Sequence, residues 1–140
     1  MNATVIIDVP EEITRFEPLR PGFTREAVLS FSSEWCRAYF NLSGDTNNDL
    51  HGDEGAGVVQ GMGIMTRLGA TISRHMPGYM VAKVGEVKFR NPVKIGHQVV
   101  MTMERLDGKD RATQVKTTLE LVGGLPITEV MLLLVRREVP

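Results

Sequence analysis

The chain has 140 residues, of which 42% are hydrophobic and 24% are charged, and its formal net charge at pH 7 is -1. This length and composition predict one globular domain that covers residues 1–140. The basic residues are scattered rather than clustered, which argues against nucleic acid or an anionic membrane surface as the main partner.

The cysteine content and the first residues bear on the compartment. Cys36 is the single cysteine, which excludes an internal disulfide and fits a reducing environment. The N-terminal stretch lacks the basic and apolar regions of a signal peptide, and no run of about 18 apolar residues predicts a membrane helix. We therefore expect a cytoplasmic protein without a membrane partner.

The first part of the chain is predicted to hold one short strand and one helix. Residues 3–8 (ATVIID) are β-like and are closed by Pro10. Between Thr24 and Leu42, apolar residues recur at spacings of three and four, as on one face of a helix. Thr24 is the predicted N-cap, and the helix is expected to stop near Gly44.

A second helix is predicted from Val58 to Met76, with Pro77-Gly78 at its end. Its residues are apolar over much of the circumference, and it contains several glycines. Glycine costs up to about 1 kcal/mol per helix-interior site relative to alanine. The glycines therefore indicate that another part of the chain, or a ligand, approaches this helix closely.

The remaining sequence alternates in polarity and is rich in β-branched residues, which is typical of strands. The predicted strands are Tyr79–Arg90, Gln98–Leu106, Arg111–Leu121 and Pro126–Arg137. Asp107-Gly108 and Gly123-Gly124 read as hairpin turns. Together these patterns predict an α+β fold in which a short strand and two helices precede a four-stranded antiparallel meander.

The polar stretch between the two helices is the first candidate for chemistry. The residues from Asp45 to Glu54 read DTNNDLHGDE, a composition that is also typical of a plain polar loop. His51 is able to exchange protons near neutrality, and a carboxylate such as Asp45 can orient it or position a water. The glycine-rich helix start that follows offers backbone N–H groups and a positive dipole end to a carbonyl oxygen. These groups would suit proton abstraction next to a carbonyl.

Three segments resemble the MaoC-like (R)-specific enoyl-CoA hydratase and 3-hydroxyacyl dehydratase family. LSGDTNNDLH is similar to the hydratase motif S-G-D-x-N-P-x-H, with one more residue between the aspartate and the histidine. VVQGMGIMTRLGATISRHMPG is similar to the central helix, which V-H-G-M opens, and FRNPVKIGH is similar to F-x-x-P-V-x-x-G-D. The resemblance implies the hotdog fold, an antiparallel β-sheet wrapped around a long central α-helix, usually as a homodimer.

The resemblance also implies roles for six residues. Asp45 and His51 would be the catalytic pair that activates one water, and Asn47 would shape the loop. The N–H of Gly61 or Met62 would polarise the thioester carbonyl. Gln60 stands where the family motif has a histidine and would contact substrate or the loop.

Other candidate residues are assigned structural roles. His75 is expected at the helix end, where a protonated imidazole complements the dipole, and His97 is expected in an exposed turn. Cys36 is interpreted as a small buried hydrophobe, and the histidine spacing predicts no metal site. Most methionines are expected to point inward. A basic rim for coenzyme A phosphates is weighed for Lys88, Arg90 and Lys94, but a solvated strand edge is slightly preferred.

The resulting hypothesis is hydration of trans-2-enoyl thioesters, or the reverse dehydration of (R)-3-hydroxyacyl thioesters, without a cofactor. The acyl group would be carried by coenzyme A or by acyl carrier protein. Two alternatives remain open at this point. One is an acyl-thioester hydrolase on the same fold, and the other is a non-catalytic hotdog domain that binds acyl groups or serves as a partner subunit.

Overall fold

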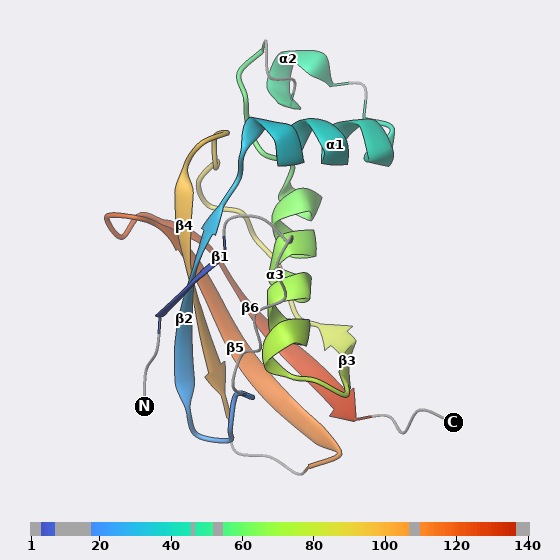
Figure 1. The fold of residues 1–140 in the computed structure, drawn as a ribbon, viewed down its shortest axis with the longest axis vertical. Coiled ribbons are helices and arrows are strands. Elements are labelled where there is room, and N and C mark those ends of the chain that lie inside the picture. The colour runs from blue at the N-terminus through green and yellow to red at the C-terminus, as the bar shows by residue number, and fades with distance from the viewer. Residues whose placement is uncertain (1–3, 8–17, 46, 52–54, 107–109, 137–140) are drawn as a thin grey trace.

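The computed structural model describes residues 4–7, 18–45, 47–51, 55–106 and 110–136. Within these residues, a six-stranded sheet curves along one long helix, α3 (Gly61–His75). The helices α1 (Ser33–Ser43) and α2 (Asn48–His51) lie together at one end of the molecule, beyond the N-terminus of α3 (Figure 1). This confirms the predicted α+β class and places the candidate loop beside the start of the long helix.

The strand order of the sheet is β1-β2-β4-β5-β6-β3, with β1 parallel to β2 and all other neighbours antiparallel. The strands are β1 (Thr4–Ile7), β2 (Thr24–Ser30), β3 (Tyr79–Val84), β4 (Gln98–Arg105), β5 (Ala112–Leu121) and β6 (Pro126–Arg136). The expected strand at residues 3–8 is thus confirmed over its described part. The predicted turn at Gly123-Gly124 joins β5 to β6, whereas Pro10, Asp107-Gly108 and Arg137 lie outside the described residues.

The predicted four-stranded meander is wrong in one respect. Strands β4, β5 and β6 follow one another in the sheet, but β3 pairs with β6 at the far edge rather than with β4. Regular strand pairing also stops at Val84 instead of continuing to Arg90. Beyond it the chain still runs beside β6, where the N–H groups of Gly85 and Arg90 donate to Met131 and Ile127.

The predicted helix from Thr24 to Leu42 is wrong over its first half, because residues Thr24–Ser30 form β2. Ala27 and Leu29 alternate with half-buried neighbours in β2, and all seven residues of the strand are in register with β4. The helix α1 starts instead after Ser32, whose side chain accepts the N–H of Trp35 at 3.1 Å. Its end agrees with the prediction, since Gly44 adopts a left-handed φ of 72°.

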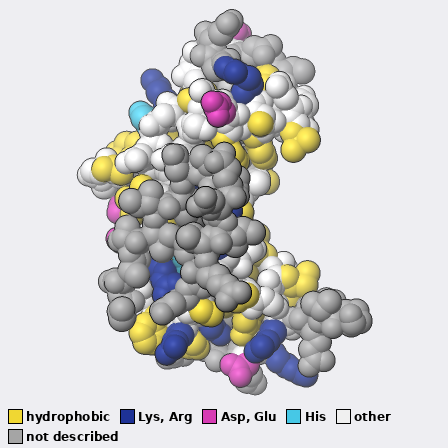
Figure 2. Space-filling model, in the orientation of Figure 1, with side chains coloured by type: hydrophobic (Ala, Val, Ile, Leu, Met, Phe, Trp, Pro, Cys, Tyr) yellow, Lys and Arg dark blue, Asp and Glu magenta, His cyan; other side chains and the backbone are white. Residues whose placement is uncertain are grey.

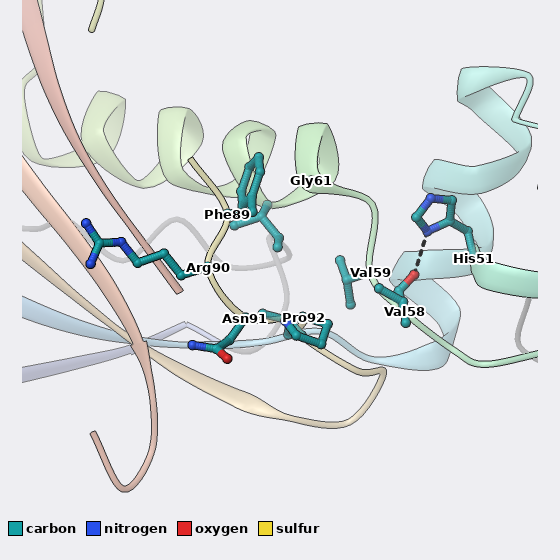
Figure 3. A pocket seen from close by; sticks show the side chains of 10 residues that line it. His51, Val58, Val59, Gly61, Phe89, Arg90, Asn91 and Pro92 are labelled. Carbon is teal, nitrogen blue, oxygen red and sulfur yellow. Dashed lines mark hydrogen bonds between the residues drawn. The ribbon is translucent and has the colours of Figure 1, made fainter. Parts of the chain in front are cut away.

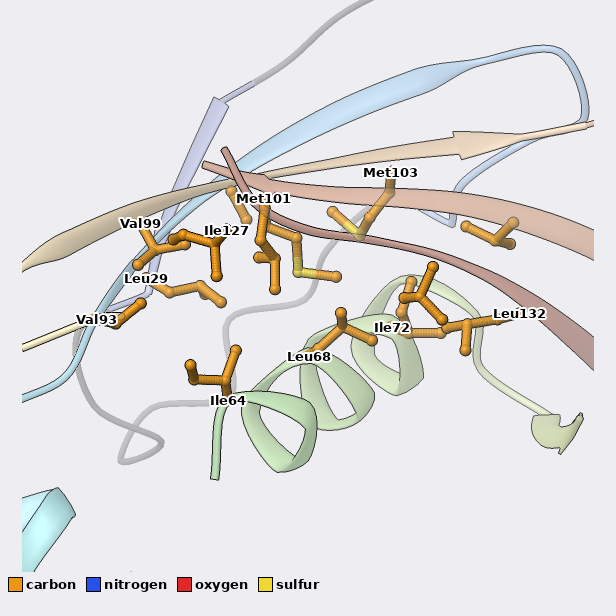
Figure 4. Packing of buried hydrophobic residues seen from close by; sticks show 14 of the residues in the cluster. Leu29, Ile64, Leu68, Ile72, Val93, Val99, Met101, Met103, Ile127 and Leu132 are labelled. Carbon is orange, nitrogen blue, oxygen red and sulfur yellow. The ribbon is translucent and has the colours of Figure 1, made fainter. Parts of the chain in front are cut away.

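The long helix starts three residues later than predicted and ends at His75, one residue before the predicted Met76 and just ahead of Pro77-Gly78. Val58 forms an isolated bridge with Lys94, and the N–H of Val59 donates to Val93 at 2.7 Å, so this segment is extended. The helix then buries a stripe of residues against the concave side of the sheet (Figure 4). The stripe consists of Ile64, Leu68 and Ile72, and it meets Leu29, Val99, Met101, Met103, Ile127 and Leu132.

The methionines divide between the core and the surface. Met76, Met101 and Met103 are buried, as expected, but Met62 is 70% exposed and Met80 is 48% exposed. The expectation that most methionines point inward is therefore wrong for these two. Met62 lies in the first turn of α3 and Met80 in β3.

The environment of His75 also differs from the expectation. It is the last residue of α3, as expected, but it is fully buried, and its Nδ1 lies 2.8 Å from the carbonyl oxygen of Thr71. Because a carbonyl only accepts, Nδ1 carries the proton. Burial lowers the pKa of His75 below its usual 6.5, so the neutral form is favoured in the folded protein.

This burial predicts a loss of stability in acid. Below pH 6.5 the unfolded chain binds a proton at this histidine more readily than the folded protein, so the free energy of unfolding falls as the pH falls. One proton accounts for a slope of at most about 1.4 kcal/mol per pH unit. In urea denaturation between pH 5 and 8, His75→Gln should flatten this slope, whereas His97→Gln, at an exposed histidine, should keep it. Equal slopes for all three proteins would contradict the prediction.

Candidate active site

The described residues from Asp45 to His51 are held together by local hydrogen bonds rather than forming an open loop. The N–H of Asn47 donates to Asp45 Oδ1 at 2.8 Å, and α2 follows as a single turn in which the N–H of His51 donates to the carbonyl of Asn47 at 2.9 Å. A helical residue advances the chain by about 1.5 Å, against about 3.3 Å in a strand. This segment has one residue more than the motif S-G-D-x-N-P-x-H, and the helical turn accommodates it with little added length.

The Asp45 carboxylate is held from two sides. One oxygen accepts the N–H of Asn47, and the other accepts the side-chain amide of Gln60, which also lies 3.3 Å from Ser43 Oγ. Asn47 thus contacts Asp45 through its backbone N–H, and the loop-shaping role of this residue stays a prediction. Gln60 directly precedes α3 and connects the aspartate to the N-terminus of this helix.

The imidazole of His51 is fixed by a backbone carbonyl. Its Nδ1 lies 2.8 Å from the carbonyl oxygen of Val58 (Figure 3). Since the carbonyl only accepts, Nδ1 carries the proton and Nε2 has a free lone pair in the neutral ring. The chain reaches this position because it turns back after α2, where the N–H of Val58 donates to the carbonyl of Leu50 at 2.9 Å.

His51 and Gly61 line one cavity of about 320 Å³. The other walls come from Val58, Val59, Ile64, Phe89, Arg90, Asn91, Pro92 and Val93. Most of these residues belong to the extended segment before α3 and to the connection between β3 and β4 (Figure 3). The cavity is therefore mainly apolar, with an imidazole on one side and the start of a helix on another.

The first turn of α3 can supply the N–H groups for an oxyanion. The first N–H groups of a helix have no acceptor within it, and the helix dipole adds partial positive charge there. Gly61 is the first residue of α3, and a Cβ built on it would lie 2.8 Å from the ring of Phe89. The absence of a side chain at this position lets the aromatic ring approach the start of the helix. This agrees with the prediction that the glycines mark a close approach of another part of the chain to this helix.

A second, much smaller cavity of about 10 Å³ lies on the other side of His51. This is roughly the space for one water molecule. Its walls include Gln60, Cys36 and Tyr39. The structure thus brings His51 next to Gly61 in one cavity and next to Gln60 in the other. Asp45 lines neither cavity and contacts this group through Gln60.

The side chain of Met62 faces a different space. It borders an apolar groove of about 520 Å³ together with Met65, Val81 and Leu132. The outline of the molecule is indented where α3 lies between α1 and β3, and hydrophobic side chains border this indentation (Figure 2). Met62 can therefore serve the candidate site through its backbone N–H and the groove through its side chain.

Aromatic contacts hold α1 against α3. The guanidinium of Arg67, a buried residue of α3, lies 5.4 Å from the ring of Trp35, which stacks on Tyr39 with ring centroids 5.3 Å apart. Gly63 permits this approach, because a Cβ there would lie 3.3 Å from the Tyr39 ring. This packing fixes the end of α1, from which the chain passes to Asp45.

The other polar and basic candidate residues are exposed or lie outside the described residues. Asp49 is exposed, and Thr46, Asp53 and Glu54 lie outside the described residues. Lys88, Arg90 and Lys94 are all exposed, and Lys88 pairs with Glu86 at 3.1 Å. Figure 3 shows the Arg90 side chain directed away from His51.

Sequence reasoning missed two participants in this site. Phe89 belongs to the F-x-x-P-V segment but received no role, although it lines both larger cavities. The carbonyl of Val58, which orients His51, carries no signal in a side chain. Among the described residues, no group of His, Cys, Asp or Glu forms a metal site, and no helix has the length and apolarity to cross a membrane.

No family model matches the sequence, and a search of curated proteins finds no match. Solved structures do match in fold. The (R)-hydratase PhaJ1 of Pseudomonas aeruginosa superposes with a TM-score of 0.75 and 20% identity, over 86% of this chain and 84% of that one. The (R)-hydratase of A. caviae involved in PHA biosynthesis gives 0.73 and 18%, over 85% and 98%.

A third structure, protein af1124 of Archaeoglobus fulgidus, superposes with a TM-score of 0.76 and 18% identity, over 91% of this chain and 85% of that one. The chain therefore has the hotdog fold, and its structural neighbours include (R)-hydratases, as the sequence resemblance led us to expect. Identities at this level establish the fold alone.

Cys36 is excluded as a nucleophile by its environment, and its reactivity tests this. The residue is buried, and desolvation raises the pKa of its thiol from 9.0 to about 11, despite the opposing charge of Arg67. Two pKa units correspond to about 100-fold less thiolate. At pH 8, a disulfide reagent should therefore label the native protein about 100-fold more slowly than the urea-unfolded chain. Equal rates would contradict the assignment, and Cys36→Ala supplies the blank.

Proposed function

We propose that the protein catalyses the (R)-specific hydration of trans-2-enoyl thioesters, or the reverse dehydration of (R)-3-hydroxyacyl thioesters. The observation that carries this proposal is the arrangement around the 320 Å³ cavity, where His51, tautomerically fixed by Val58, and the N-terminus of α3 at Gly61 share one space. A base and an oxyanion site on one apolar cavity suit addition to a double bond conjugated with a carbonyl. The fold shared with (R)-hydratases supports the same reaction.

In this proposal, His51 and Asp45 share the work on a single water. The free Nε2 of His51 accepts a proton from the water, whose oxygen adds to C3 of the enoyl group, and the same nitrogen then delivers this proton to C2. Asp45, held by Asn47 and Gln60, would orient the water through its carboxylate. The sum is one water added across the double bond, and the reverse sequence removes it.

The negative charge that develops on the thioester oxygen would be met by the start of α3. The N–H of Gly61, or that of Met62, would donate to this oxygen, and the helix dipole would favour the charge. Gln60 would act indirectly, by holding the aspartate through its side-chain amide. The family motif has a histidine at this position. A histidine could become charged, whereas the side-chain amide of Gln60 does not titrate.

The acyl carrier is proposed to be coenzyme A or acyl carrier protein, and the compartment the cytoplasm, as the sequence predicts. An acyl-thioester hydrolase would use the same helix start to bind the carbonyl but would release a free thiol. A non-catalytic acyl-binding domain would do neither. The fixed tautomer of His51 leaves one nitrogen ready to accept a proton from water, which either enzyme could use. The fold shared with (R)-hydratases is what supports the hydratase.

We also propose that two copies of the chain pair through β3 as a homodimer. This strand has β6 on one side and forms the end of the sheet order on the other. Its residues Met80, Val81 and Val84 are 48%, 37% and 46% exposed. An edge strand with exposed apolar residues is prone to pairing with another strand. A second copy at this edge would also cover the open side of the groove beside Met62.

Turnover of crotonyl-CoA tests the reaction and its two central residues. The conjugated enoyl absorbance should fall in the presence of the wild-type protein. Asp45→Asn and His51→Ala should each lower kcat/KM by about 10²- to 10⁴-fold, the usual contribution of a general acid or base.

The matched controls are Asp49→Asn, at an exposed aspartate next to His51, and His97→Ala, at an exposed histidine. Both should retain the wild-type rate. Release of free thiol in step with the loss of the enoyl thioester would favour the hydrolase instead, because hydration leaves the thioester bond intact. Absence of any turnover would overturn the catalytic proposal.

The mass in solution tests the dimer. Light scattering should give twice the chain mass of 15.5 kDa for the wild type. Met80→Lys, which places a charge on the open edge strand, should shift the protein toward the monomer. Val122→Lys, at a residue that is 62% exposed in the β5–β6 hairpin, is the control and should remain dimeric. A wild-type monomer would refute this part of the proposal.

A further inference from the structure

Phe89 stands between the two larger cavities of the molecule. It lines the 320 Å³ cavity that contains His51 and Gly61, and it also lines the 520 Å³ apolar groove beside Met62 and Val84. Figure 3 shows its ring next to the first turn of α3, on the side where Gly61 begins the helix. A single side chain therefore forms a wall of both spaces.

The position of the ring is set by its neighbours. A Cβ on Gly61 would lie 2.8 Å from Phe89 Cε2 and 3.2 Å from both Cδ2 and Cζ, so the ring occupies the space that a side chain at position 61 would need. The backbone is fixed directly after Phe89, because the N–H of Arg90 donates to Ile127 at 2.8 Å. The side chain itself is 43% exposed, which leaves it room to rotate.

The two spaces differ in what they can bind. The first contains the imidazole of His51 and the start of α3, so it suits the polar, reacting end of a ligand. The second is bordered almost entirely by apolar side chains, including Met65, Val81 and Leu132. An apolar tail that extends from the first space toward the second meets the ring of Phe89 on its way.

We propose that Phe89 sets the acyl chain length that the protein accepts. This rests on the proposed function, since it assigns the first cavity to the thioester and the reacting carbons. A short acyl chain ends in front of the ring and fills the first cavity. A longer chain enters the apolar groove only if the ring rotates away, which costs contacts with Gly61. The wild type is therefore selective for short acyl chains.

Substitution of Phe89 should change the ratio between substrates. The measurement is kcat/KM for the trans-2-enoyl thioesters of coenzyme A with four and with eight carbons. In Phe89→Ala the ratio of the eight-carbon to the four-carbon value should rise at least about tenfold, since one methylene in an apolar pocket can count for about 10- to 200-fold. Phe89→Trp should lower the same ratio. Unchanged ratios in both variants would overturn the proposal.

The matched control is Phe23→Ala. Phe23 is an aromatic residue of nearly equal exposure, 39% against 43%, and lies in the turn before β2. Its loss should leave the ratio at the wild-type value. An equal rise in Phe23→Ala would mean that general loosening of the fold, rather than the ring at position 89, changes the selectivity.

Binding separates this inference from the reaction itself. The saturated butyryl and octanoyl thioesters of coenzyme A cannot be hydrated, so calorimetry with them reports occupancy alone. A wild type that turns over no enoyl thioester, but whose octanoyl-to-butyryl affinity ratio rises at least about tenfold in Phe89→Ala, would refute the hydratase and sustain the role of Phe89. Failure of the wild type to bind either thioester would overturn both.

Discussion

The burial of one face of α3 against the concave side of the sheet is the constraint on which the rest of the structure depends. Ile64, Leu68 and Ile72 place the helix across β4 and β6, so its N-terminus emerges at one end of the sheet. Every group of the candidate site is positioned from that end. The N–H groups of the first turn belong to the helix itself, and Gln60, immediately before it, holds the Asp45 carboxylate.

The site is then completed by backbone contacts more than by side-chain pairs. His51 is oriented by the carbonyl of Val58, which belongs to the extended segment that leads into α3. In the same segment, the N–H of Val58 donates to the carbonyl of Leu50. This hydrogen bond connects α2 to the segment that leads into α3. These two contacts place the Val58 carbonyl at the imidazole and fix its tautomer.

The sequence predicted the elements that local pattern determines and missed those that depend on distant partners. The long helix, its Pro-Gly end and the last three strands carry strong periodicity and were found. Residues 24–30 satisfied both a helical and an alternating pattern, and only pairing with β4 decides between them. The place of β3 beside β6, the burial of His75 and the Val58 carbonyl at His51 have no local signal either. The structure places His51 beside Gly61 and Gln60, whereas a function for the stretch and the catalytic roles of its residues remain predictions.

Gly61 links the two properties that a thioester site of this kind needs. As the first residue of α3 it presents its N–H where charge would develop, and its missing side chain admits the ring of Phe89 to within contact of the helix. A larger residue at position 61 would push the ring of Phe89 toward the apolar groove. The shape of the cavity that contains His51 and the shape of the groove would then change together. In the proposed reaction, polarisation of the carbonyl and selection of chain length would therefore be coupled through one backbone position. A substitution at position 89 would change the chain-length preference and leave the N–H of the helix start in place.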